Sequence, residues 1–184
     1  MTVNPLPHHL IVVLAAHGAP PTDYPPMRVG LLMMLEFAGN KAERLRPLRS
    51  WRERLTQEVI RWPRTPENDP YKRAVDDLAQ RLAARLGCRV IASYNEFCAP
   101  TVDEAIDQAV EEGARRVIVI PTMLLRGNSH TEHEIYASVI QARQRHPDVS
   151  IEYAWPFHED LITSLFAEQV AQYLQPLSQP ELAK

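Results

Sequence analysis

The sequence lacks several features that would assign it to a class directly. No apolar run approaches the roughly 20 residues that a membrane-spanning helix needs, and residues 1–9 lack the cationic-then-apolar order of a signal peptide. We therefore expect a cytoplasmic protein with no membrane partner. Only two cysteines are present, Cys88 and Cys98, without a C-x-x-C motif, which excludes a disulfide scaffold. No internal repeat or low-complexity tract is found, and 184 residues fit a single domain, 1–184.

The net charge is small, but the charges are unevenly distributed. Residues 41–64 hold eight Lys or Arg against three Glu, so this segment carries +5 and the remainder of a chain of net charge -3 carries -8. Such a segment indicates an anionic partner, although a solvated helix face explains it equally well. Its aromatic residues are only Trp51 and Trp62, which is too few for a base-stacking platform, so we expect no nucleic-acid partner.

Short apolar runs alternate with amphipathic helical patterns along most of the chain. The strand patterns cover 10–14, 89–94, 117–120 and 149–154. The helical patterns cover 71–86, 101–113, 132–145 and a stretch after 158, and the second and third begin with T-x-x-E capping boxes. This alternation predicts right-handed crossovers and an α/β fold with a single doubly wound parallel four-stranded sheet flanked by helices.

The alternation of strand and helix patterns is interrupted between the first strand and the helix at 71–86. Prolines at 20, 21, 25 and 26 open the break, and those at 63, 66 and 70 close it. About 50 residues are too many for a plain connection, so we predict a helical insertion, 20–70, after strand one. It is expected to contain an apolar helix at 27–37 and an Arg-rich helix at 48–62.

Polar residues follow each of the four predicted strands. They are His17, Glu96, the cluster 130–134 and His158. Because carboxyl ends of parallel strands share one edge of a sheet, these side chains should look out along that edge. Two imidazoles and a carboxylate suit a divalent first-row metal such as iron, cobalt or nickel, and without thiolates a structural zinc site is not expected.

Simpler explanations compete at each position. His17 and Glu96 can be ordinary turn residues, and Glu134 can be only the third residue of a helix-capping box. His133 is expected to face solvent, because H-x-x-H-E is not the zinc protease order H-E-x-x-H. His158 is expected to shape a turn.

Two motifs resemble the class II tetrapyrrole chelatases, and most nearly the sirohydrochlorin cobalto- and ferrochelatases. They are L-I-V-V-L-A-A-H-G at 10–18 and G-A-R-R-V-I-V-I-P-T-M-L-L-R-G-N-S-H-T-E-H-E-I at 113–135. Y-N-E-F-C-A-P-T-V-D-E-A-I and Y-A-W-P-F-H-E-D-L-I are similar to the second and last strands of that family. The likeness covers 10–18 and about 71–172, and it leaves out the insertion.

The resemblance implies a lyase that inserts Co²⁺, Fe²⁺ or Ni²⁺ into a tetrapyrrole such as sirohydrochlorin, in siroheme or cobalamin biosynthesis. It implies no covalent catalysis and no tightly bound cofactor, since the metal is a substrate. The implied metal ligands are His17, His130 and Glu96. Glu134 occupies the position of a further family acid, and Arg126 and Ser129 beside the site are expected to bind the tetrapyrrole.

Other interpretations stay open beside the chelatase. The same residues could serve a non-catalytic carrier of metal or tetrapyrrole, or a chelatase acting on a different porphyrin. The apolar stretch 31–37 could cover a ring face, or it could be an added core or subunit-contact helix. Because one such domain is half of the two-lobed fold of longer relatives, the resemblance also implies a homodimer whose interface completes the tetrapyrrole cleft.

Overall fold

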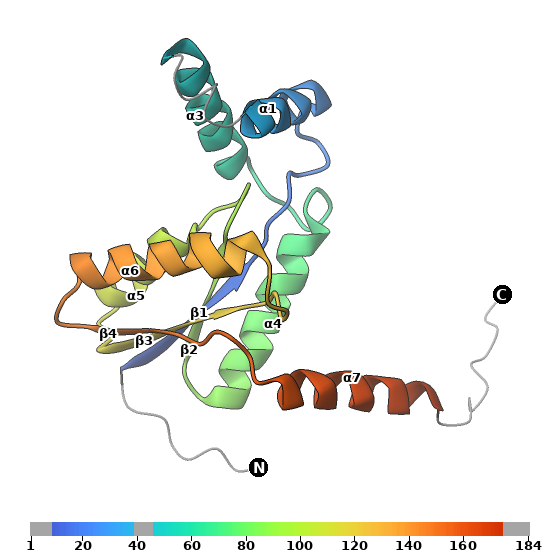
Figure 1. Ribbon diagram of the computed structural model, residues 1–184, viewed down its shortest axis with the longest axis vertical. Helices are drawn as coiled ribbons and strands as arrows, with labels where there is room; N and C mark the ends of the chain where they lie inside the picture. Colours follow the sequence, from blue (N-terminus) through green and yellow to red (C-terminus); the bar gives the residue numbers. More distant parts are fainter. Residues whose placement is uncertain (1–8, 39–45, 175–184) are drawn as a thin grey trace.

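One parallel sheet forms the centre of the computed structural model, which describes residues 9–38 and 46–174 (Figure 1). Its strands are β1 (Leu10–Ala16), β2 (Arg89–Tyr94), β3 (Arg116–Pro121) and β4 (Ser150–Tyr153). All neighbours pair in parallel in the order β2-β1-β3-β4, which confirms the predicted four-stranded sheet. Every residue of β1 is buried, as expected for a central strand covered on both faces.

The helices follow the strands along the chain, as the sequence predicted. They are α1 (Pro26–Ala38), α3 (Arg46–Ile60), α4 (Pro70–Leu86), α5 (Val102–Glu111), the π-helical turn η1 (His130–Glu134), α6 (Ile135–Arg145) and α7 (Glu159–Leu174). Most predicted boundaries agree to within about two residues. In the described part of the chain, no helix combines the length and the apolar character needed to cross a membrane.

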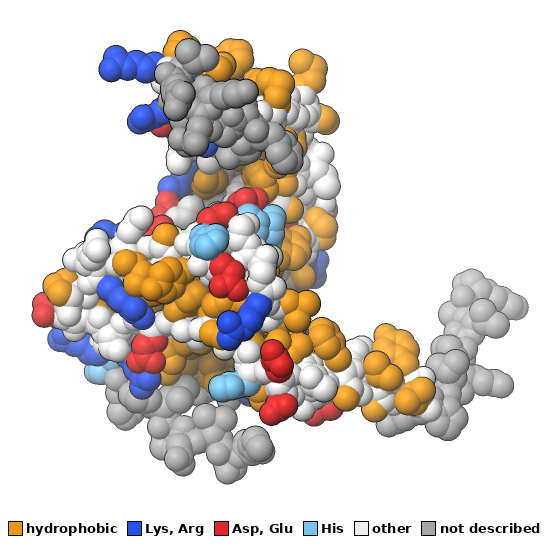
Figure 2. Space-filling view, in the orientation of Figure 1, with side chains coloured by type: hydrophobic (Ala, Val, Ile, Leu, Met, Phe, Trp, Pro, Cys, Tyr) orange, Lys and Arg blue, Asp and Glu red, His pale blue; other side chains and the backbone are white. Residues whose placement is uncertain are grey.

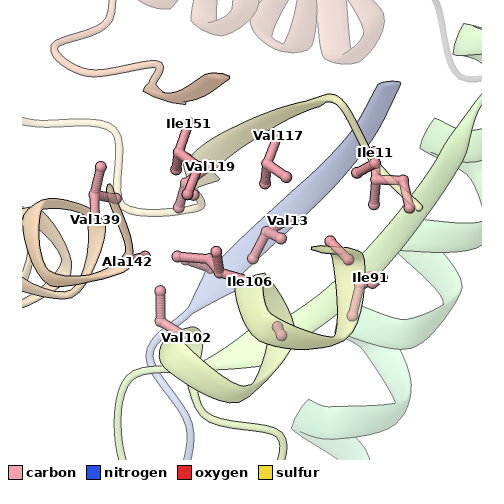
Figure 3. Packing of buried hydrophobic residues seen from close by; sticks show 14 of the residues in the cluster. Ile11, Val13, Ile91, Val102, Ile106, Val117, Val119, Val139, Ala142 and Ile151 are labelled. Atoms are coloured by element: carbon pink, nitrogen blue, oxygen red, sulfur yellow. The ribbon is translucent and has the colours of Figure 1, made fainter. Parts of the chain in front are cut away.

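The larger core lies between the sheet and the helices α5 and α6 (Figure 3). Alternate residues of the central strands, among them Val13, Val117 and Val119, point to this face and pack against Ile106 of α5 and Val139 of α6. All five are fully buried. Burial on this scale supplies most of the folding free energy, at roughly 1.5–3 kcal/mol for each large apolar side chain.

The opposite face of the sheet is covered by α4 over β1 and β2. Val75 and Ala79 pack against Val12 and Leu14 there. The sequence placed Leu78 on the same buried face of α4, and this was wrong, because Leu78 is 48% exposed. A residue three positions after Val75 lies about 60° round the helix, which turns Leu78 from the sheet to an exposed flank of α4.

The two predicted capping boxes have different outcomes. At α5, the Glu104 amide donates to Thr101 Oγ1 (3.3 Å) and Glu104 Oε2 accepts from the Thr101 amide (2.8 Å), which confirms the first box. The box at Thr131 and Glu134 was wrong. The Thr131 hydroxyl donates backward to the carbonyl of Asn128 (3.0 Å), and the chain enters α6 through η1 instead. Single π-helical turns of this kind are frequent at functional sites.

Helices α1 and α3 pack together as an arm that stands away from the sheet (Figure 1). The arm has a small core of its own, in which Tyr24, Leu32 and Val59 are buried. Both helices were predicted, and part of the apolar stretch 31–37 packs inward, while Met34 is 60% exposed. Residues 41–45 of the basic segment lie outside the described residues. The limits of the insertion, 20–70, stay a prediction.

Helix α7 is formed but does not pack on its own domain. It begins beyond the linker 154–158 and runs away from the sheet (Figure 1). None of its 16 residues is buried.

Candidate metal centre

Three predicted ligands converge at the carboxyl edge of the sheet. His17 follows β1, Glu96 follows β2, and His130 begins η1 after β3. Each offers one ligand atom, and these atoms all lie within 4.8 Å of one another. Nitrogen and oxygen donors at this separation can close on a single divalent ion with a small rotation of the side chains.

Backbone pairing beyond the strand ends holds two of these ligands in register. The Asn95 amide donates to the Ala16 carbonyl (2.8 Å), and the Glu96 amide donates to the His17 carbonyl (2.9 Å). The β1–β2 ladder therefore continues into both loops. As a result, backbone hydrogen bonds hold the loops of His17 and Glu96 side by side.

The two imidazoles meet edge to face. Their ring centroids lie 4.6 Å apart with an interplanar angle of 85°. His17 Nδ1 lies 2.9 Å from the carbonyl of Gly18, which can only accept, so we assign the proton of the neutral ring to Nδ1. The lone pair of His17 Nε2 is then available for a metal ion.

His130 is oriented by a carboxylate, as ligand histidines commonly are. Its Nδ1 lies 3.0 Å from Glu134 Oε2, and Asn95 Nδ2 donates to the same oxygen (2.6 Å). Asn95 Nδ2 also lies 2.9 Å from His130 Nδ1. Because the carboxylate of Glu134 can only accept, and Asn95 donates to it over the shorter distance, we assign the Nδ1 proton of His130 to the bond with Glu134, which leaves Nε2 free. Burial opposes ionisation of Glu134, but the hydrogen bonds from His130 and Asn95 outweigh it and hold the pKa of this carboxyl below its ordinary value.

The turn that carries His130 is fixed from both sides. Asn128 Oδ1 accepts from the His130 amide (2.9 Å), and the hydroxyl of Tyr153 on β4 donates to the carbonyl of Thr131 (3.0 Å). Thr131 is fully buried. Although eight residues separate β3 from η1, hydrogen bonds therefore fix the backbone that carries the histidine.

The remaining predicted residues surround the cluster or lie away from it. Arg126 and Ser129 are exposed on the loop before η1, where a ligand above the edge of the sheet could reach them. His133 is exposed, as predicted. His158 is exposed where the chain enters α7, and its carbonyl accepts from the Leu161 amide (3.0 Å).

Comparison with known proteins identifies the family. The family model described as CbiX matches residues 67–173, more than half of the chain. The chain belongs to the CbiX family.

The relatives of this CbiX chain include named chelatases. A sirohydrochlorin ferrochelatase of Priestia megaterium is 29% identical over 78 residues, or 42% of this chain and 29% of that protein. A sirohydrochlorin cobaltochelatase of the same organism is 38% identical over 74 residues, or 39% of this chain and 24% of that protein. The matched segments therefore span less than a third of these curated relatives.

The fold is shared with a solved member of the family. A cobalamin (vitamin B12) biosynthesis CbiX protein of Marinobacter aquaeolei VT8 superimposes with a TM-score of 0.52 at 16% identity, covering 89% of this chain and 95% of that one. At this identity, the likeness shows the fold alone.

Two residues of this CbiX chain contribute to the site without having been assigned a role from the sequence. Asn95 was noted only as a polar residue at the end of a strand. Arg64, at the end of the insertion, is 9% exposed, and its guanidinium donates to the carbonyls of Ala19 (2.8 Å) and Phe97. These carbonyls belong to the loops of His17 and Glu96. No local pattern around Arg64 distinguishes it from its many basic neighbours.

A hollow lies between the arm and the body of the CbiX chain, and histidine and acidic side chains gather below it (Figure 2). The arm itself contains a cavity of about 280 Å³ between α1 and α3, lined by the apolar groups of Leu31 and Trp51, by Arg54, and by Arg28 paired with Glu58. The arm therefore offers apolar contacts and, in Arg54, a cation that a flat polycarboxylate would use.

Proposed function

We propose that this protein is a metal chelatase that inserts Co²⁺ or Fe²⁺, or alternatively Ni²⁺, into sirohydrochlorin or a similar tetrapyrrole. The observation that carries the proposal is the cluster of His17, Glu96 and His130 at an open edge of the sheet. The names of the relatives support the substrate class, and the reaction would serve siroheme or cobalamin biosynthesis in the cytoplasm.

The ligands of the cluster suit a metal ion that binds transiently and is then passed to the tetrapyrrole. His17 Nε2 and His130 Nε2 would hold it through neutral nitrogens, and three protein ligands leave coordination positions open to a ring nitrogen. Insertion exchanges one divalent cation for the two pyrrole N–H protons of the macrocycle. Glu96, about one third exposed, either completes the metal site or accepts one of these protons. Glu134 orients His130.

The tetrapyrrole would lie in the hollow between the cluster and the arm. Sirohydrochlorin carries eight carboxylates, so the proposal assigns its binding to cations around the hollow. Arg126 and Ser129, exposed on the loop before η1, would contact the tetrapyrrole from the side of the sheet, and Arg54 would contact it from the arm. Guanidinium groups bind carboxylates in a planar two-bond geometry that also fixes orientation.

The proposal covers one domain, 1–184, interrupted by the insertion 20–70, with the metal as substrate and no tightly bound cofactor. The sheet supplies one wall of the cleft. A homodimer would supply the opposite wall from a second copy.

Metal insertion can be followed by the absorbance of sirohydrochlorin with Co²⁺ or Fe²⁺. The wild type should accelerate the spectral change over the uncatalysed reaction, and a His17→Ala, His130→Ala double variant should not. His133→Ala, an exposed histidine on the same turn, is the matched control and should retain the wild-type rate.

The outcomes separate the alternatives. Equal rates for the wild type and the double variant would rule out the chelatase. Tight stoichiometric binding of metal or tetrapyrrole without turnover would select the carrier instead. Faster insertion into another porphyrin than into sirohydrochlorin would change the substrate but keep the reaction.

A further inference from the structure

Helix α7 presents an apolar surface that its own chain does not cover. Six of its large apolar side chains are each more than half exposed, namely Leu161, Leu165, Phe166, Val170, Tyr173 and Leu174. Phe166, Val170 and Tyr173 share one face, whereas Ser164 and Ala171 lie on the opposite one. An isolated helix of 16 residues is marginal in water, so a helix of this composition needs a surface to pack on.

The same domain carries a vacant surface of matching character. Val12 and Leu14 of β1 pair in register with Ile118 and Ile120 of β3, so all four side chains point to the face that α4 covers. The residues of β1 are buried there, but Ile118 and Ile120 are only partly buried. Parallel sheets normally have helices over both faces, and this position over β3 lacks one among the described residues.

One flank of α4 borders the vacant surface. Lys72, Asp76 and Gln80 lie on the other flank, where they line a groove together with residues of β2. The flank toward β3 therefore presents Leu78, followed one and two turns later by Arg81 and Arg85, all exposed. A helix seated over β3 would meet apolar and cationic side chains along α4.

The two surfaces match in charge and in size. Helix α7 contains three acidic residues and no Lys or Arg, whereas the flank of α4 toward β3 carries Arg81 and Arg85. Four of these side chains, Phe166, Val170, Tyr173 and Leu174, lie within about 100° of one another round the helix and amount to roughly 500 Å² on each helix. Two helices and the two surfaces that they cover would bury roughly 2,000 Å² in total, which reaches the ~1,200–2,000 Å² of stable specific interfaces.

We propose that two copies of this chain exchange their α7 helices, each helix packing over β3 and beside α4 of the other copy. The linker 154–158 holds α7 pointing away from its own sheet (Figure 1). A two-fold axis beside the linker would place each helix on the vacant surface of the other copy. Both copies then use the same surfaces, so the assembly stops at two chains. The inference rests on the homodimer proposed above and supplies its contact surface, but it does not require chelatase activity.

Light scattering during gel filtration tests the pairing. The wild type should have about twice the 21.0 kDa mass of one chain, and Phe166→Glu, Val170→Glu should have the mass of one chain. Ser164→Glu, Ala171→Glu adds the same charge on the opposite face and should leave the doubled mass unchanged. A wild type with the mass of one chain, or a Phe166→Glu, Val170→Glu variant that stays paired, would overturn the proposal.

Cross-linking tests which copy receives the helix. Chains carrying Leu78→Cys are mixed with chains carrying Val170→Cys, allowed to re-equilibrate, and treated with a bismaleimide. The mixture should give a covalent product of doubled mass in higher yield than either variant alone. The wild type, treated in the same way, measures any cross-linking through Cys88 and Cys98. The double variant Leu78→Cys, Val170→Cys should likewise link between chains, and linkage only within single chains would mean that α7 closes on its own sheet. Neither test uses metal or tetrapyrrole, so failure here is separate from failure of the chelatase proposal.

Discussion

A Cβ atom added to Gly18 would lie 1.9 Å from the carbonyl oxygen of Glu96. This glycine also has φ +98°, a conformation that other residues rarely adopt. We expect Gly18→Ala to lower the free energy of unfolding by more than about 2 kcal/mol, because clash and backbone strain add. It should also weaken metal binding, since the contact separates the loops of His17 and Glu96. Urea denaturation and a Co²⁺ titration measure the two effects.

Gly30 is the control for this substitution. It lies within α1, and nothing comes within 4 Å of an added Cβ. Gly30→Ala should therefore raise stability by about 0.5–1 kcal/mol through helix propensity and leave Co²⁺ affinity unchanged. Equal loss of stability in both variants would contradict the close approach of the two loops.

Replacing Glu134 by Gln removes the carboxylate that orients His130. We expect Co²⁺ affinity to fall by about 10–100-fold, the usual cost of losing such a group, with little change in stability. His133→Ala, one residue earlier and exposed, should leave affinity unchanged. Calorimetric titration of both variants checks this, and an unchanged Glu134→Gln affinity would return Glu134 to a purely structural role.

Arg64 pairs with Asp69, whose side chain is only 3% exposed. Arg64→Met would leave that carboxylate buried without its cation, so we expect a loss of about 3–5 kcal/mol. Adding Asp69→Asn should restore part of this loss, because the uncompensated charge is gone and asparagine still caps α4. Denaturation of the single and double variants gives the coupling.

Arg61→Gln provides the comparison for a surface pair. Arg61 contacts Glu104 with more than half of its side chain exposed, so solvent screening should limit the loss to about 1 kcal/mol or less. A loss as large as that of Arg64→Met would mean that burial does not distinguish the two arginines.

The surroundings of Asp107 lead us to expect that the free energy of unfolding depends on pH. Burial opposes its ionisation, but hydrogen bonds from His146 and Arg145 outweigh this and hold the pKa of the carboxyl below its ordinary value. A carboxyl whose pKa is lower in the folded state than in the unfolded state stabilises the fold at any pH above its unfolded pKa. This stabilisation is lost as the pH falls through the pKa of the folded state. Asp107→Asn should therefore cost up to about 1 kcal/mol at pH 7, since the group is partly exposed, and nothing in strong acid. The exposed Asp148→Asn should show no such trend.

Strands and ligands were predictable because their signals are local or follow from topology. The apolar run at 117–120 is entirely β-branched and ends at a proline, which favours a strand, and the parallel order brings His17, Glu96 and His130 to one edge. The capping box at Thr131 failed because Ser and Thr also bond backward to carbonyls, as Thr131 does with Asn128. The role of Arg64 could not be predicted from the sequence, because it depends on hydrogen bonds to the carbonyls of Ala19 and Phe97, which are distant along the chain.

The placement of the ligands also fixes how many ions an assembled pair would hold. All three come from one chain, on the loops after β1, β2 and β3, while α7 follows β4, the strand whose end adds none. Exchange of α7 therefore leaves each ligand set whole. A Co²⁺ titration should end at one equivalent per chain with a hyperbolic curve, and dilution that separates the copies should release no metal.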